Sequence, residues 1–233
     1  MTERLGSILQ EHIVRVTIGA VALDGILRLP EGARAVVLFA HGSGSGRLSP
    51  RNRHVAGLLN RAKVATLLVD LLTADEEAID ARTGHLRFDI ELLAQRLVGA
   101  TDWLTQRPDR RQLAIGYFGA STGPAAALVA ATQRGDVIIG AIVSRGGRPD
   151  LAGAALPHVR APTLLIVGGS DVHVIQLNRI ALAELRCKKQ LIIIPVATHL
   201  FEEPGALDEV ARLACEWFQG HLFSTARHDA ERR

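Results

Sequence analysis

Residues 113–131 read LAIGYFGASTGPAAALVAA, and this stretch decides the fold. It begins with an apolar run typical of a buried strand and ends in an alanine-rich run that favours a helix. Between them, residues 119–123 form a G-x-S-x-G pentad, which predicts a sharp strand-to-helix turn that presents a serine hydroxyl at the edge of a sheet. We therefore expect Ser121 to be a nucleophile. The alternative is a tight turn that serves packing alone.

Apolar runs with the length of buried strands recur on both sides of this stretch. We expect strands at 12–18, 21–28, 35–40, 64–69, 113–118, 137–143, 163–167 and 190–194, and helices at 50–61, 86–107, 122–134, 174–186 and 206–221. The first two strands alternate polar and apolar residues across a two-residue turn, which predicts an antiparallel hairpin at a sheet edge. Because strands and helices alternate afterwards, we expect one domain with a mostly parallel, eight-stranded sheet and helices on both faces. Its core should span about residues 12–222, with frayed tails.

Composition restricts the classes of function. The 233 residues include 48% hydrophobic but only 4% aromatic side chains, so the core must be mainly aliphatic. A formal net charge of +3 gives no reason to expect a nucleic-acid partner. Cys187 and Cys215 lie too far apart to suggest a zinc site or a disulfide framework. No secretory leader and no run of roughly 18 apolar residues is visible. We expect a cytoplasmic protein without a membrane partner, and the sequence leaves open whether it forms a homodimer.

A nucleophilic serine needs a base, and the base needs a carboxylate that orients it. His199 stands in the loop after the last expected strand, and Asp171 follows the strand before it. Because the carboxyl ends of parallel strands share one edge, we expect Ser121, Asp171 and His199 to meet there. Asp150 is a rival acid, and Asp171 would otherwise serve as the N-cap of the next helix. The alternative for His199 is an ordinary surface loop histidine.

The reaction would also need hydrogen-bond donors for a developing oxyanion. We expect one from the backbone N–H of Thr122 and another from the small-residue loop after the strand at 35–40. Within that loop the N–H of Ser43 is favoured, with Gly42 and Gly44 as substitutes. The alternative, a phosphate-binding loop, is disfavoured because the sequence lacks the G-K-[ST] ending of such loops.

Several arginines lie near the expected edge of the sheet. Arg145, together with one arginine of residues 47–53, could bind an anionic substrate. The simpler interpretation is that these arginines pair with Asp70, Asp150 or loop backbone.

Five segments together resemble the dienelactone hydrolase-like branch of the α/β-hydrolase superfamily: FAHGSGSGRLSPRN (39–52), GYFGASTG (116–123), SRGGRPDL (144–151), LLIVGGSD (164–171) and ATHLFEEPG (197–205). The resemblance covers about residues 12–222. It implies an α/β-hydrolase fold, a triad of Ser121, Asp171 and His199, and hydrolysis of esters or lactones without a metal or organic cofactor. The namesake enzyme uses a cysteine nucleophile, whereas this elbow carries a serine.

These observations together predict a serine hydrolase that cleaves carboxylic esters or lactones through an acyl-enzyme. Two alternatives stay open: other chemistry on the same triad, such as thioester, peptide or carbon–carbon bond cleavage or acyl transfer, and a non-catalytic binding protein with this fold. The short connection between the strands at 137–143 and 163–167 leaves no room for a large lid. The polar segment 73–89 should instead form one wall of the substrate pocket.

Overall fold

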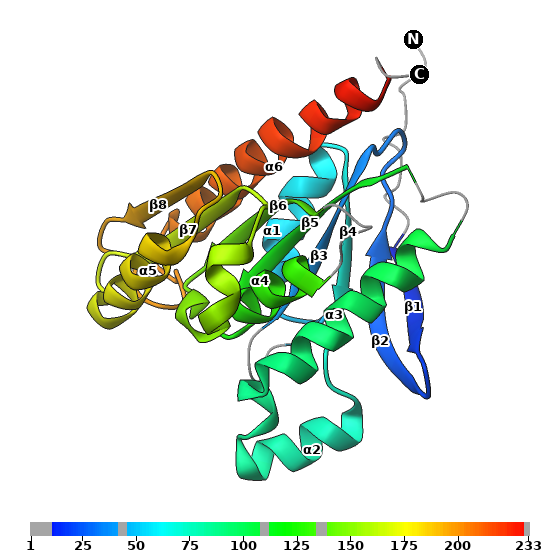
Figure 1. Ribbon diagram of the computed structural model, residues 1–233, viewed down its shortest axis with the longest axis horizontal. Coiled ribbons are helices and arrows are strands. Elements are labelled where there is room, and N and C mark those ends of the chain that lie inside the picture. Colours follow the sequence, from blue (N-terminus) through cyan, green and yellow to red (C-terminus); the bar gives the residue numbers. More distant parts are fainter. Residues whose placement is uncertain (1–10, 42–45, 108–111, 134–138, 231–233) are drawn as a thin grey trace.

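The computed structural model describes residues 11–41, 46–107, 112–133 and 139–230, without the side chains of residues 224–230. Its strands form one sheet in the order β1-β2-β4-β3-β5-β6-β7-β8 (Figure 1). The strands are β1 (Glu11–Ile18), β2 (Val21–Arg28), β3 (Ala35–Ala40), β4 (Val64–Val69), β5 (Ala114–Ala120), β6 (Ile139–Arg145), β7 (Thr163–Gly168) and β8 (Lys189–Ile194). The eight-stranded sheet and its antiparallel hairpin are therefore confirmed.

Helices cover both faces of this sheet. They are α1 (Pro50–Arg61), α2 (Ala74–Thr83), η1 (Leu86–Phe88), α3 (Ile90–Thr105), α4 (Gly123–Gln133), η2 (Pro149–His158), α5 (Val172–Glu184) and α6 (Ala206–Ala230). Helices α1 and α6 pack together on one face, whereas α3, α4 and α5 cover the other. Helix α2 extends away from the sheet beyond the first turn of α3 (Figure 1). No helix within the described ranges is long and apolar enough to cross a membrane.

The sheet is antiparallel at one end and parallel elsewhere. Strand β1 pairs antiparallel with β2, and β2 pairs antiparallel with β4. From β4 to β8 every neighbouring pair is parallel, so the carboxyl ends of these strands lie at one edge. In open parallel sheets this edge is where ligands bind.

The burial of the central strands explains why their positions could be predicted from the sequence. Every residue of β3, β4 and β7 is buried, as expected for strands covered on both faces. The largest fully buried side chains include Tyr117 and Phe118, which point to opposite faces of β5. Tyr117 belongs to the core on one face of the sheet, and Phe118 belongs to the core on the other face. The Tyr117 hydroxyl lies 2.7 Å from the Thr101 hydroxyl of α3, so its polar end is satisfied inside the core.

Four helical features differ from expectation. Helix α2 and the 3₁₀ segment η2 were not expected, and α6 continues to Ala230 instead of ending at 221. The helix expected at 86–107 is divided, because Asp89 accepts a hydrogen bond from the Leu92 N–H and begins α3 as an N-cap. Strand β6 ends at Arg145, two residues later than expected.

Two glycine substitutions should have opposite effects on stability. A Cβ at Gly123 would overlap the carbonyl oxygen of Ala40, whereas a Cβ at Gly57 in α1 meets nothing within 4 Å. We expect Gly123→Ala to lower the free energy of unfolding by about 1–3 kcal/mol, the usual cost of overpacking. Gly57→Ala should raise it by up to about 1 kcal/mol through helix propensity. Chemical denaturation of both variants measures the two changes. Equal stability of the two variants would contradict this account of the turn.

Candidate active site

Ser121 occupies a strained position directly after β5. Its φ of 55° lies in the left-handed region, which non-glycine residues rarely adopt. Helix α4 begins two residues later at Gly123, so the chain turns from strand to helix within this step. Glycines are required at both ends of the pentad, because a Cβ at Gly119 would overlap the backbone of Pro124. This geometry is the turn that the pentad predicts.

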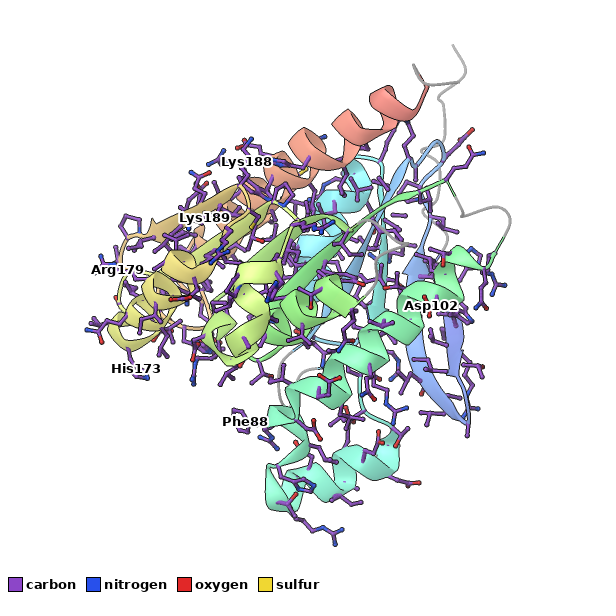
Figure 2. The ribbon with its side chains drawn as sticks, in the orientation of Figure 1. Phe88, Asp102, His173, Arg179, Lys188 and Lys189 are labelled. Atoms are coloured by element: carbon purple, nitrogen blue, oxygen red, sulfur yellow. The ribbon has the colours of Figure 1, made fainter. Side chains whose placement is uncertain are left out.

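Asp171 and His199 form a hydrogen-bonded pair. The Nδ1 atom of His199 lies 2.7 Å from Oδ2 of Asp171. Since a carboxylate only accepts, Nδ1 carries the proton, and Nε2 of the neutral ring remains free to take another. The His199 side chain is 44% exposed and that of Asp171 is 16% exposed, so the carboxylate is the more enclosed partner. His173 is exposed at the start of α5 and takes no part in this pair (Figure 2).

The alternatives for the acid have other geometries. Asp171 does occupy the N-cap position of α5, but its side chain makes no capping hydrogen bond. The rival Asp150 accepts hydrogen bonds of 2.7–3.2 Å from the guanidinium of Arg148. Its oxygens are therefore occupied, whereas the carboxylate of Asp171 is directed at the histidine.

Backbone hydrogen bonds join the loops that carry the acid and the base. The N–H of Ser170 donates to the carbonyl of Ala197 over 3.0 Å, and its hydroxyl donates to the carbonyl of Val196 over 3.1 Å. Val196 and Phe201, on either side of His199, both have φ near +58°, with values of 59° and 57°. The loop after β8 is thus held in an unusual path against the loop after β7.

A third loop contacts both the serine and the histidine. The N–H of Arg148 donates to the carbonyl of Ser121 over 2.8 Å. A Cβ built on Gly146 would lie 3.0 Å from the His199 carbonyl oxygen and 3.7 Å from its Nδ1. The loop after β6 therefore contacts the backbone of Ser121 and lies against His199 at the same edge of the sheet. Among the described residues the Ser121 hydroxyl has no hydrogen-bond partner, and such bonds often form only when substrate is bound.

The expected oxyanion donors are only partly described. Ser43, Gly42 and Gly44 lie outside the described residues. Thr122 is 2% exposed at the start of α4, and its hydroxyl oxygen is buried without a hydrogen-bond partner.

Arg145 differs from the other arginines at this edge. Arg47 pairs with Asp70, and Arg148 pairs with Asp150, as the simpler interpretation expected. The side chain of Arg145 is only 7% exposed, and its Nε and Nη1 atoms are buried without an acceptor. Burial, and to a smaller extent the charge of Arg51, lowers the pKa of Arg145 to about 10. It therefore remains a cation at neutral pH without a carboxylate partner.

A cavity of about 390 Å³ opens beside Thr122. Its apolar lining comes from Leu48, Leu71, Leu72, Ala81 and Leu93, and its charged lining from Arg47, Asp70, Glu77, Asp80 and Arg87. The segment 73–89 supplies several of these residues, so it does form a wall. Next to them on η1, Phe88 is exposed and points away from the sheet (Figure 2).

Sequence reasoning assigned no site role to the carboxylates of this wall. Asp70 directly follows β4 at the carboxyl edge of the sheet. Its position after an expected strand could have identified it in the sequence as a candidate site residue. Helix α2 begins with a capping box, in which Thr73 and Glu76 each bind the backbone N–H of the other at 3.2 and 2.8 Å. The T-x-x-E spacing that predicts such a helix start was also present in the sequence. The described residues include no group of three His, Cys, Asp or Glu side chains arranged to hold a metal ion.

This fold and this arrangement of residues define an α/β-hydrolase. A solved structure of dienelactone hydrolase from Anabaena variabilis is 64% identical, with a TM-score of 0.89 over 92% of this chain and 99% of that chain. The chain therefore belongs to the dienelactone hydrolase-like branch of the α/β-hydrolases, a family of hydrolases. Est1E from Butyrivibrio proteoclasticus, at 16% identity and a TM-score of 0.73 over 89% of this chain and 98% of that chain, shares the fold.

Curated relatives from Mycobacterium tuberculosis are longer. Two proteins, from the CDC 1551 and H37Rv strains, are 56% identical over 214 residues and carry the name "Putative phosphoribosyl transferase". The match covers 92% of this chain but 47% of each relative, so the chain spans about half their length. No family model matches the chain.

The segment 74–89, which forms one wall of the cavity, should become less stable at acidic pH. Burial raises the pKa of the Asp80 carboxyl, but hydrogen bonds from the backbone and side chain of Arg87 outweigh it and hold that pKa below its usual range. A depressed pKa adds stability at neutral pH that is lost as pH falls through the folded-state value. We expect proteolysis within residues 74–89 to accelerate below about pH 4.

The variant Asp80→Asn should show faster cleavage already at pH 7, with a smaller further increase in acid. Asp75→Asn, an exposed acid on the same helix, should behave like the parent protein. Cleavage at the same rate in all three proteins at every pH would refute the role of Asp80.

Proposed function

We propose that the protein hydrolyses carboxylic esters or lactones through an acyl-enzyme on Ser121. The observation that carries the proposal is the 2.7 Å pair of His199 and Asp171, held on loops next to the elbow serine. A relative 64% identical that is named a dienelactone hydrolase supports it. The elbow carries a serine, so the nucleophile would be an alcohol activated by a base.

The reaction has two balanced steps. His199 Nε2 takes the proton of the Ser121 hydroxyl while its oxygen attacks the acyl carbon, and the same proton then passes to the departing alcohol. Water next attacks the acyl-enzyme, giving its proton to His199, and the acid leaves as Ser121 is protonated again. Asp171 holds the ring in the required tautomer and stabilises the imidazolium. The backbone N–H groups of Thr122 and Ser43 would receive the oxyanion.

The longer relatives do not favour phosphoribosyl transfer by this chain. Their name belongs to proteins of which the chain spans 47%. By contrast, the relative named as a hydrolase is matched over 99% of its own chain. Thioester, peptide or carbon–carbon bond cleavage on the same triad remains the alternative chemistry.

Removing the nucleophile or its orienting acid should abolish most activity. We expect Ser121→Ala to lower kcat on 4-nitrophenyl esters by roughly 10³-fold or more, and Asp171→Asn by up to about 10⁴-fold. A fluorophosphonate probe should label the parent protein and fail to label Ser121→Ala. Asp150→Asn is the matched control for the acid and should retain triad activity. Absence of both labelling and turnover in the folded parent protein would favour a non-catalytic binding function.

We also propose that Arg145 binds an anionic part of the substrate. Its buried, unpartnered nitrogens support this role, because a buried cation without an acceptor is costly. Arg145→Gln should reduce kcat/KM for carboxylated esters more than for neutral esters, by about tenfold in the ratio. Arg145→Lys keeps the charge and should retain part of that preference. This control shows whether a loss in Arg145→Gln comes from the missing charge or from misfolding. Equal losses on both ester classes would refute the role.

A further inference from the structure

Among the described residues, one carboxylate that lines the cavity beside Thr122 has no hydrogen-bond or ion-pair partner. Asp70 accepts from the Arg47 N–H over 2.6 Å and from the Arg47 guanidinium. Asp80 accepts from the Arg87 N–H over 3.0 Å and from its Nε over 2.6 Å. Glu77 is exposed at the mouth and lines the same cavity, but its carboxylate accepts no hydrogen bond from the described residues.

The carboxylates of the described lining outnumber its arginines. The cavity is lined by the guanidinium groups of two arginines and by three carboxylates. His41 also lines it, and its Nε2 lies 3.3 Å from the Leu71 nitrogen and 3.5 Å from Oδ1 of Asp70. Because both arginines are already held by carboxylates, the group available to a ligand is the carboxylate of Glu77.

A second polar group in the wall is also unsatisfied. The hydroxyl oxygen of Thr122 is buried without a partner, although Thr122 is 2% exposed and lines the cavity. Buried hydroxyls are normally hydrogen-bonded, so an orphan one in a cavity wall points to a polar ligand. This hydroxyl lies one residue from the proposed nucleophile, whereas Glu77 belongs to α2 on the outer side of the cavity. A ligand that satisfies both would carry polar groups at its two ends and could be apolar between them.

The ionisation of Glu77 agrees with this interpretation. Partial burial raises the pKa of its carboxyl, the charges of Asp70 and Asp80 raise it further, and Arg47 opposes them. Burial and the two carboxylates therefore raise the pKa of Glu77 more than the nearby charge of Arg47 lowers it. A bound cation would reverse this balance and favour the ionised form.

We propose that this cavity receives an acyl group that carries a positively charged amine, with Glu77 as its specificity-determining residue. The proposal rests on the esterase function argued above and names the substrate class of that site. The volume of about 390 Å³ fits a small or medium acyl group. A carboxylated acyl group would meet the excess of carboxylates here, so an anion at Arg145 belongs to a different part of the substrate.

A pair of esters that differ in one charge tests the proposal. The substrates are 4-nitrophenyl 6-aminohexanoate and 4-nitrophenyl hexanoate, and the readout is the ratio of their kcat/KM values. The parent protein should prefer the amino ester, and Glu77→Gln should lower the ratio on the order of tenfold, as expected for a hydrogen bond between charged groups. Asp75→Asn removes the same charge from α2 outside the cavity and should leave the ratio unchanged.

The same ratio should depend on pH. As pH falls, Glu77 should take up a proton at a higher pH than an ordinary glutamate, because its pKa is raised, and the preference should decline toward that of Glu77→Gln. The amine stays protonated throughout, and the ratio cancels any loss of activity that is common to both esters. A ratio that is equal in the parent protein and Glu77→Gln at pH 7 overturns the proposal while leaving the esterase function intact.

A binding experiment tests the cation site without requiring hydrolysis of a substrate. In ¹H–¹⁵N NMR titrations, 6-aminohexanamide should bind the parent protein more tightly than hexanamide, and Glu77→Gln should lose that difference. If neither ester is hydrolysed but the difference in binding persists, the esterase function fails and the cation site stands. If the two amides bind equally to the parent protein, the cation site is refuted.

Discussion

The close approach of α4 to β3 at Gly123 is the constraint on which the site depends. The helix can begin within two residues of β5 only because Gly123 has no Cβ to meet the carbonyl oxygen of Ala40. That short step forces Ser121 to a φ of 55°. Strain of this kind persists only where the surroundings over-determine the backbone, and it is common at functional sites. The hydroxyl is therefore positioned by packing of the sheet against the helix.

The loops that carry Ser121, Asp171 and His199 follow neighbouring strands at the same edge of the sheet. Strands β5, β6, β7 and β8 are consecutive and parallel, so the loops after them lie side by side. The loop after β6 contacts both Ser121 and His199 through its glycine and backbone N–H. A carboxylate and an imidazole that are 28 residues apart in sequence thus become hydrogen-bonded neighbours, and the Asp171 carboxylate binds the ring instead of capping α5.

The central strands and the two main site loops were predictable because their signals are local. Continuous apolar runs mark buried parallel strands, and the pentad fixes the elbow. Helix α2 escaped prediction because residues 74–83 carry no apolar stripe, so only its capping box marked it. Arg145 was expected in a loop, but strand pairing with Ala120 and Ile166 extends β6 to include it.

The pairing of charges could not be read from the sequence, since it depends on which loops meet. Arg47 and Asp70 lie 23 residues apart and Arg96 and Glu76 lie 20 apart, yet both pairs form across the cavity wall. Many charged side chains near the edge were equally plausible partners beforehand. Only the folded arrangement distinguishes Arg47 and Arg148, which pair with carboxylates, from Arg145, whose Nε and Nη1 find no acceptor among the described residues.

This unequal pairing gives the two sides of Ser121 opposite electrostatic character. Arg145 ends β6 next to Val143, which belongs to the core under α1 and α6, and it brings an unpaired positive charge there. The cavity under α2 and α3 instead has an excess carboxylate. Alternation of side chains along parallel strands makes such a division natural, because neighbouring positions face opposite layers. A substrate with one charge of each sign would be oriented by this field before any contact with the nucleophile.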